Sequence, residues 1–289
     1  MISRFTSTFT AVFTSQSVGL AGALVLLSLS GEAAPSLESV AFAAAAGLTG
    51  VAGLACFYYA LSRGTMGVIA PLAALIGAGV PVLLAIYGGE HVSFGRLTGI
   101  VLALVAVVLI SLPGGETSPT ERRKVRLEVA ELPLVLLAGL GFAGFFVFIG
   151  RASADGGVFW PLTVVRTVGV ALVVFGLVFA LLRGREMPLR ERMGLVLGVA
   201  RLRTWPSSRF ALVGTFVIGG VGDLGGNVFF VLARHADLFS VAVVLSSLYP
   251  VITTVLAVLL LRERLRPQQV AGVVLATLSV VLLSNALPV

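Results

Sequence analysis

Two charged residues stand deep inside stretches of the sequence that are otherwise almost entirely apolar. Arg166 lies about nine residues into the stretch 157–182, and Asp223 lies about ten residues before the end of the stretch 209–233. A charge inside a bilayer costs about 2.5–3.5 kcal/mol on insertion scales, so it usually faces a partner or a wet cavity. At a rise of 1.5 Å per helical residue, both would lie about 14–15 Å from one membrane face. We therefore expect them to pair.

Such a pair has a functional interpretation and a structural one. In the functional interpretation Arg166 binds a carboxylate or another anionic group of a substrate, while Asp223 binds an amine or takes up a coupling proton. In the structural interpretation the two residues form an ion pair that locks two helices together. The sequence leaves both open.

Three uncharged polar residues extend the candidate substrate site. Asn227 lies one helical turn beyond Asp223 and therefore on the same face. Tyr249 precedes a proline, which frees backbone carbonyls within a helix, and Gln16 lies in a serine-flanked stretch near the N-terminus. For Gln16 the alternative interpretation is ordinary hydrogen bonding between helices. For the hydroxyl groups around Tyr249 it is hydrogen bonding to their own backbone.

Elements that position these residues must be membrane helices, because the composition excludes an ordinary soluble domain. Of the 289 residues 58% are hydrophobic and 11% are charged, with a mean hydropathy of +1.08, whereas soluble domains carry about 25% charge. Apolar stretches long enough to cross a bilayer recur along the chain. We predict an all-α polytopic bundle whose spans cover about 8–30, 38–61, 66–88, 94–112, 132–150, 157–182, 209–233, 238–261 and 267–286.

Loop charges give an orientation for this bundle. Most loop arginines follow the second, fourth, sixth and eighth spans, whereas the other side holds Arg96, Arg151 and Arg234. Because basic loops stay cytoplasmic, we expect the N-terminus inside and, after nine crossings, the C-terminus outside. The net charge of +7 is then explained by membrane lipid rather than by nucleic acid.

The sequence also contains an internal repeat of the kind that builds transporters from two inverted halves. One offset aligns Gly19 with Gly169 and Gln16 with Arg166, and a second aligns Glu90 with Glu263. We predict a first repeat of four helices at 1–112, a basic linker at 113–131 and a second repeat of five helices at 132–289. The span at 132–150 has no counterpart, which suggests that a first helix is missing.

Glycines surround the charged pair. Gly219, Gly220, Gly222, Gly225 and Gly226 flank Asp223, and the spacing of Gly222 and Gly226 predicts a close approach of another helix. Backbone flexibility for gating is the alternative.

Two segments resemble the EamA-type permeases of the drug/metabolite transporter superfamily. Residues 57–111 and 229–284 each read as a helix, a small-residue turn, a proline-containing helix, an acidic loop with Glu90 or Glu263, and a glycine-bearing last helix. The resemblance implies ten helices with both ends cytoplasmic, and amino acids, related metabolites or toxic compounds as substrates, commonly exported. This chain departs from it in lacking a counterpart of the first helix.

Several function classes are disfavoured. There is no P-loop for an ATP-driven pump, no HExxH or GxSxG motif for an enzyme, and the single cysteine, Cys56, offers no metal site. We expect no cofactor and no metal. The sequence favours a secondary transporter of small molecules in the inner (plasma) membrane. It leaves undecided whether transport is coupled to protons at Asp223 and whether the protein forms a homodimer. A non-transporting scaffold and a flippase for lipid-linked intermediates are the alternatives.

Overall fold

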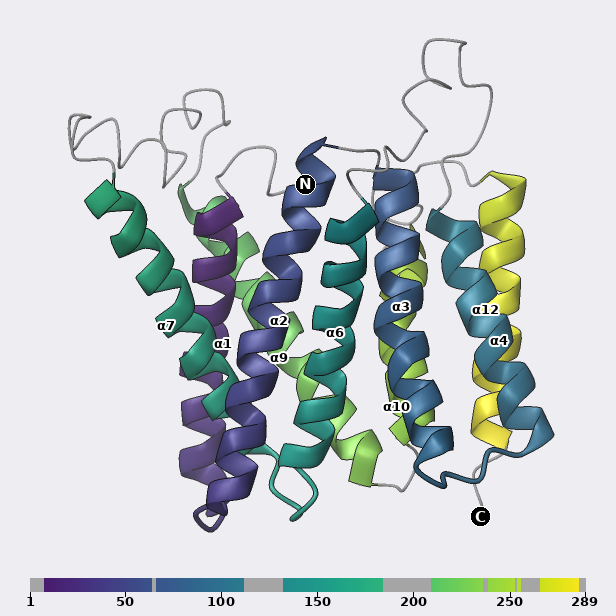
Figure 1. The fold of residues 1–289 in the computed structure, drawn as a ribbon, viewed down its shortest axis with the longest axis horizontal. Coiled ribbons are helices and arrows are strands. Elements are labelled where there is room, and N and C mark those ends of the chain that lie inside the picture. Colours follow the sequence, from purple (N-terminus) through teal and green to yellow (C-terminus); the bar gives the residue numbers. More distant parts are fainter. Residues whose placement is uncertain are drawn as a thin grey trace. The chain divides into compact units, whose positions relative to one another are not determined.

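The computed structural model describes residues 8–63, 66–111, 132–183, 209–235, 239–252, 254–255 and 266–285. Within these ranges every regular element is a helix (Figure 1). The helices are α1 (Thr8–Ser30), α2 (Leu37–Arg63), α3 (Met66–Tyr87), α4 (Phe94–Ser111), α6 (Leu132–Ala152), α7 (Phe159–Arg183), α9 (Arg209–His235), α10 (Phe239–Ser247) and α12 (Pro267–Asn285). The predicted all-α class is thus confirmed.

Eight of the described helices are long and apolar enough to cross a membrane. The remaining apolar helix is shorter, at Phe239–Ile252, and the end of the span predicted at 238–261 lies outside the described residues. α10 itself ends at Ser247, three residues before Pro250. A proline lacks the amide hydrogen and clashes with the carbonyl four residues earlier, which explains the interruption.

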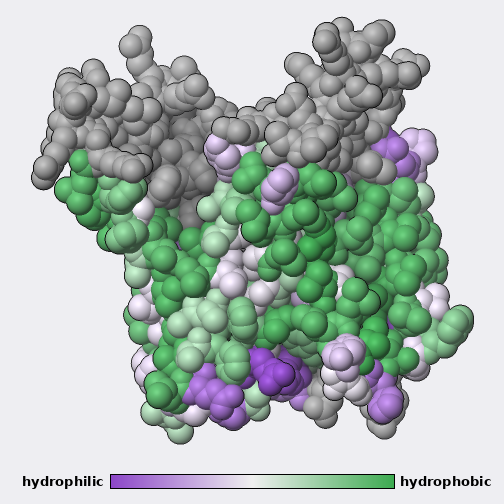
Figure 2. All heavy atoms as spheres, viewed as in Figure 1, coloured by the Kyte–Doolittle hydropathy of each residue, from purple (hydrophilic) through white to green (hydrophobic). Residues whose placement is uncertain are grey.

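The side chains on the outside of the helices are those of a protein in lipid. Large hydrophobic residues are widely exposed, with Ile218 at 74% and Phe229 at 73%. In Figure 2 hydrophobic side chains cover the helices in view, and hydrophilic residues gather near helix ends. In water so much exposed apolar surface would promote association, so these faces fit the hydrocarbon core of a bilayer.

Two compact units make up the chain, and neither coincides with a sequence half. The first unit comprises 1–48 and 151–232, and the second comprises 49–150 and 233–289. The first therefore contains α1, α7 and parts of α2 and α9. The second contains α3, α4, α10, α12, nearly all of α6 and the remaining parts of α2 and α9. Each unit takes helices from both predicted repeats. The division into sequence halves at 1–112 and 132–289 stays a prediction.

Helix boundaries agree with the predicted repeat. The offset that aligns Glu90 with Glu263 also aligns the first residues of α3 and α10, Met66 and Phe239. It aligns the first residues of α4 and α12, Phe94 and Pro267, in the same way. The first residues of α2 and α9 agree to within one position.

Packing in the second unit shows how the repeated helices are related. A Cβ added at Gly99 would lie 2.9 Å from Leu283 Cγ, and one at Gly272 would lie 2.5 Å from Ile110 Cγ1. The repeat aligns Gly99 with Gly272 and Ile110 with Leu283. The two contacts are therefore equivalent, with the roles of α4 and α12 interchanged. As the residue number rises along α4 it falls along α12. The two helices are therefore antiparallel, as inverted repeats require.

Candidate functional site

Helices α1 and α7, both in the first unit, position the two longest polar side chains of the site. A Cβ at Gly169 would lie 2.9 Å from Gln16 Cδ, and a Cβ at Gly19 would lie 3.1 Å from Arg166 Nε. Gln16 thus packs on the glycine of α7, and Arg166 packs on the equivalent glycine of α1. Each helix therefore places one side chain on the glycine of the other. Because residue 16 meets 169 and residue 19 meets 166, the two helices cross in antiparallel directions. The glycines let the two helices approach closely enough for their side chains to interact across the interface.

Arg166 is the centre of a polar cluster that joins three helices. Its Nη1 donates a hydrogen bond of 2.8 Å to Gln16 Oε1 on α1 and one of 2.6 Å to Asp223 Oδ2 on α9. Ser15 Oγ of α1 donates a further hydrogen bond of 3.2 Å to the same oxygen of Asp223. The structure therefore brings together Gln16, Arg166 and Asp223, as their positions in the sequence predict.

The two charges of this pair lie in different surroundings. The Arg166 side chain is 3% exposed, whereas that of Asp223 is 47% exposed. Both contacts of the carboxylate involve Oδ2, which leaves Oδ1 as an acceptor. Arg166 Nε and Nη2 are buried without a hydrogen-bond partner within the described part of the chain. A buried, incompletely hydrogen-bonded charge is costly, so this arrangement is a poor structural lock.

The charged pair also belongs to only one of the two repeats. The residues that the repeat aligns with Arg166 and Asp223 are Gln16 and Gly50, neither of which is charged. The same pair of helices therefore exists in the other repeat without an ion pair. The ion pair is thus a feature of one repeat and not of the repeated fold.

The other two predicted site residues lie on α9 and directly after α10. Asn227 follows Asp223 by one turn of α9 and is partly buried. Tyr249 belongs to the second unit, directly after the interruption at Leu248, and is 52% exposed. Ser15 is the residue that the sequence interpretation undervalued, since it was seen as a neighbour of Gln16 and not as a partner of Asp223.

The close helix approach predicted from Gly222 and Gly226 is wrong for the described residues. Among the described residues, Cβ atoms added at Gly219, Gly222, Gly225 or Gly226 would find nothing within 4 Å. Only Gly220 of the five is in contact, with Val18 Cβ 2.7 Å from its added Cβ. The spacing of small residues permits close packing but does not supply a neighbour.

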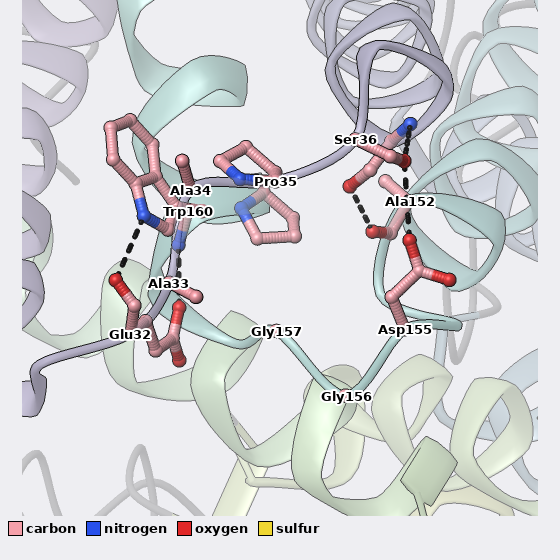
Figure 3. A pocket seen from close by; sticks show the side chains of 12 residues that line it. Glu32, Ala33, Ala34, Pro35, Ser36, Ala152, Asp155, Gly156, Gly157 and Trp160 are labelled. Carbon is pink, nitrogen blue, oxygen red and sulfur yellow. Dashed lines mark hydrogen bonds between the residues drawn. The ribbon is translucent and has the colours of Figure 1, made fainter.

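A cavity of about 270 Å³ lies at one end of the first unit, where the α1–α2 turn meets the α6–α7 turn (Figure 3). The Glu32 carboxylate accepts hydrogen bonds of 2.9–3.1 Å from the backbone N–H groups of Val158, Phe159 and Trp160. Glu32 thereby caps the N-terminus of α7, whose first amides lack partners within the helix. On the other side of the cavity Ser36 Oγ donates to Asp155 Oδ2 at 3.2 Å.

Glu90 has the same role in the second unit. Its carboxylate accepts hydrogen bonds from the backbone N–H of Ser240, at 3.3 Å, and from the Ser240 hydroxyl. It therefore caps α10 from the α3–α4 turn. In the sequence Glu90 marks only the acidic loop that the two repeated segments share, and nothing there indicates a role for Glu32. No local motif identifies a cap whose donor lies more than a hundred residues away.

Comparison with known proteins supports the resemblance. The model of the EamA-like transporter family matches residues 130–285. One solved structure, titled only "Crystal structure of protein", has a TM-score of 0.65 at 15% identity and covers 96% of this chain and 88% of its own. At that identity the likeness shows the fold alone. No curated protein matches the sequence. The family match spans more than half of the chain, and the many apolar helices of the chain fit a membrane permease. The chain is therefore a member of the EamA-like transporter family.

Proposed function

We propose that this chain is a secondary transporter of the plasma membrane that exports small metabolites such as amino acids. Family membership supports a general transporter role, and the substrate, the direction and the energy coupling are parts of the proposal. The observation that carries it is the Arg166–Asp223 pair, deep in two apolar helices and charged in one repeat only. Inverted repeats of this kind place substrate and coupling-ion sites near the membrane midplane.

The roles of the two charges follow from their chemistry. Arg166 would bind the carboxylate of a substrate, because a guanidinium donates several hydrogen bonds in a fixed geometry and stays protonated. Asp223 would bind the amine in exchange for its contact with Arg166. Gln16 and Asn227 would complete the polar lining.

Proton coupling would use the same carboxylate. A proton and a substrate amine both neutralise Asp223, so they would compete for it and could be moved in opposite directions through alternating conformations. A ligand shifts such an equilibrium only by its differential affinity for the two states. Gain or loss of a proton by Asp223, beside the buried charge of Arg166, would supply this difference in affinity between the two conformations.

The test is uptake of amino acids and cationic drugs by inverted membrane vesicles, with and without an imposed pH gradient. We expect gradient-dependent accumulation by the native chain, and its loss in Asp223→Asn and in Arg166→Gln. Thr277→Val is the control, because Thr277 is exposed and its Oγ1 donates to Val273 O of its own helix at 2.9 Å. Full pH-driven transport by Asp223→Asn would refute coupling at this residue. Absence of transport of every compound by folded protein would favour the scaffold alternative.

A further inference from the structure

Helix α1 packs on α9 through one face and on α7 through another. Toward α9 it presents Val18, whose Cβ lies 2.7 Å from a Cβ added at Gly220. A Cβ added at Gly22 would lie 2.7 Å from Leu224 Cδ2, which also belongs to α9. Ser15 precedes Val18 and Gly22 by three and seven residues and therefore shares their face. The side chain of Ser15 is thus directed at α9.

The face of α1 toward α7 begins one residue later, with Gln16 and Gly19. Here two planar side-chain groups lie on glycines of the opposite helix. A Cβ added at Gly169 would lie 3.0 Å from Gln16 Nε2, and one added at Gly19 would lie 3.3 Å from Arg166 Cζ. Adjacent helix positions differ by about 100° around the axis, so Ser15 and Gln16 point to different helices.

Each charged group of the site has one contact with its partner and one with α1. Arg166 Nη1 carries two hydrogens, and it donates to Gln16 Oε1 at 2.8 Å and to Asp223 Oδ2 at 2.6 Å. The same Oδ2 also accepts from Ser15 Oγ at 3.2 Å. A carboxylate oxygen has room for two donors, so the two contacts of each group do not compete. When Arg166 separates from Asp223, it can keep its contact with Gln16. Asp223 can then keep its contact with Ser15.

The chemical type of each α1 residue suits the group that it binds. Arg166 stays protonated and only donates hydrogen bonds, and the carbonyl oxygen of Gln16 only accepts them. Asp223 accepts as a carboxylate and donates as a carboxylic acid, and the Ser15 hydroxyl can do both. The hydroxyl can therefore stay hydrogen-bonded to Asp223 with or without a proton on the carboxylate.

We propose that two adjacent residues of α1, Ser15 and Gln16, are positioning residues that hold the two charges while the ion pair is open. A substrate with an amine and a carboxylate must separate Arg166 from Asp223 in order to bind both. Without the α1 contacts, the substrate would have to order both side chains, at a cost in affinity. This inference rests on the proposed transport function and adds a role for Ser15.

The first test requires no transport and measures whether the Ser15 contact persists without the ion pair. In an Arg166→Leu background, Ser15→Ala and Asp223→Ala are combined in a double-mutant cycle of melting temperatures in mild detergent. We expect the losses to be non-additive by about 2 °C or more, because the hydroxyl still binds the carboxylate. Ser28→Ala is the matched control on α1, because Ser28 is exposed and its Oγ donates to Val25 O at 2.7 Å. Its loss should add to that of Asp223→Ala.

The corresponding cycle tests the Gln16 contact. In an Asp223→Ala background, Gln16→Leu and Arg166→Leu should be non-additive by about 2 °C or more, because Gln16 Oε1 still accepts from the guanidinium. Additive losses in either cycle would overturn the inference, since that α1 contact would then depend on the ion pair.

The second test uses single variants and the uptake of radiolabelled L-leucine by inverted membrane vesicles. Ser15→Ala should raise the half-saturating concentration about tenfold, through loss of a hydrogen bond to a charged group. The maximal rate should change by less than about twofold, because the loss concerns binding. Ser15→Thr keeps the hydroxyl and should restore the native value, and Ser28→Ala should not alter it. A merely structural role would reduce the amount of folded protein, and with it only the maximal rate.

The outcomes separate this inference from the function on which it rests. An unchanged half-saturating concentration in Ser15→Ala, or one that Ser15→Thr does not restore, would overturn the positioning role. Non-additive cycles in a folded native protein that transports no amino acid would refute the transport function, while supporting the contacts by which α1 holds each charge.

Discussion

The unequal burial of Arg166 and Asp223 predicts unequal effects of removing either charge. Replacing Asp223 by Asn leaves an unpaired cation that is 3% exposed, whereas replacing Arg166 by Gln leaves a carboxylate that is 47% exposed. Removing one partner of a fully buried pair costs about 3–5 kcal/mol, and exposed pairs contribute about 0–1 kcal/mol. Because one partner here is half exposed, we expect about 2 kcal/mol for Asp223→Asn and about 1 kcal/mol or less for Arg166→Gln.

Thermal unfolding in mild detergent measures this difference. At about 2–4 °C per kcal/mol for chains of this size, Asp223→Asn should lower the melting temperature by about 4–8 °C. The double variant Arg166→Gln/Asp223→Asn should recover most of that loss, because no charge then remains buried and unpaired. A double variant whose loss equals the sum of the two single losses, within about 0.5 kcal/mol, would refute the reasoning.

Three further perturbations test the packing and the caps. Gly53→Ala should lower the stability in detergent melting by about 1–3 kcal/mol, because the added Cβ would lie 3.0 Å from Gly141 Cα and 3.1 Å from Ala138 O. Gly79→Ala is the control and should leave the stability unchanged, because its Cβ would meet nothing within 4 Å among the described residues. Glu32→Gln should cost about 1–2 kcal/mol through loss of the cap on α7, and an unchanged melting temperature would contradict this. Glu90→Ala and Ser240→Ala should show non-additive losses in a double-mutant cycle, since each removes the hydrogen bond between the Ser240 hydroxyl and the side chain of residue 90.

Much of the fold could be predicted because hydropathy is a local property of the chain. Each predicted span agrees with a helix to within about two residues at its start, from Thr8 of α1 to Pro267 of α12. Backbone groups in a bilayer must be satisfied within the segment, so an apolar stretch of that length has few alternatives to a helix. Pro250 indicated freed carbonyls within the span predicted at 238–261, whereas the end of α10 at Ser247 is a finding of the structure.

The pairing of Arg166 with Asp223 was also within reach of the sequence. Two opposite charges at the same depth in an apolar bundle have few partners other than each other, and the depth follows from the helical rise. The repeat alignment of Gln16 with Arg166 identified a third member of the cluster. Their assignment as substrate-binding residues remains a proposal.

Tertiary structure alone decided what each glycine and each loop carboxylate does. Gly19 and Gly169 hold crossing side chains, whereas Cβ atoms added at Gly222 and Gly226 would meet nothing within 4 Å in the described part of the chain. Glu32 caps a helix that begins far along the chain. The sequence determined the helices, their ends and the depth of the charges, because those depend on residues close together in the chain. The structure decided the neighbours, because contacts between helices depend on crossing positions that no local pattern encodes.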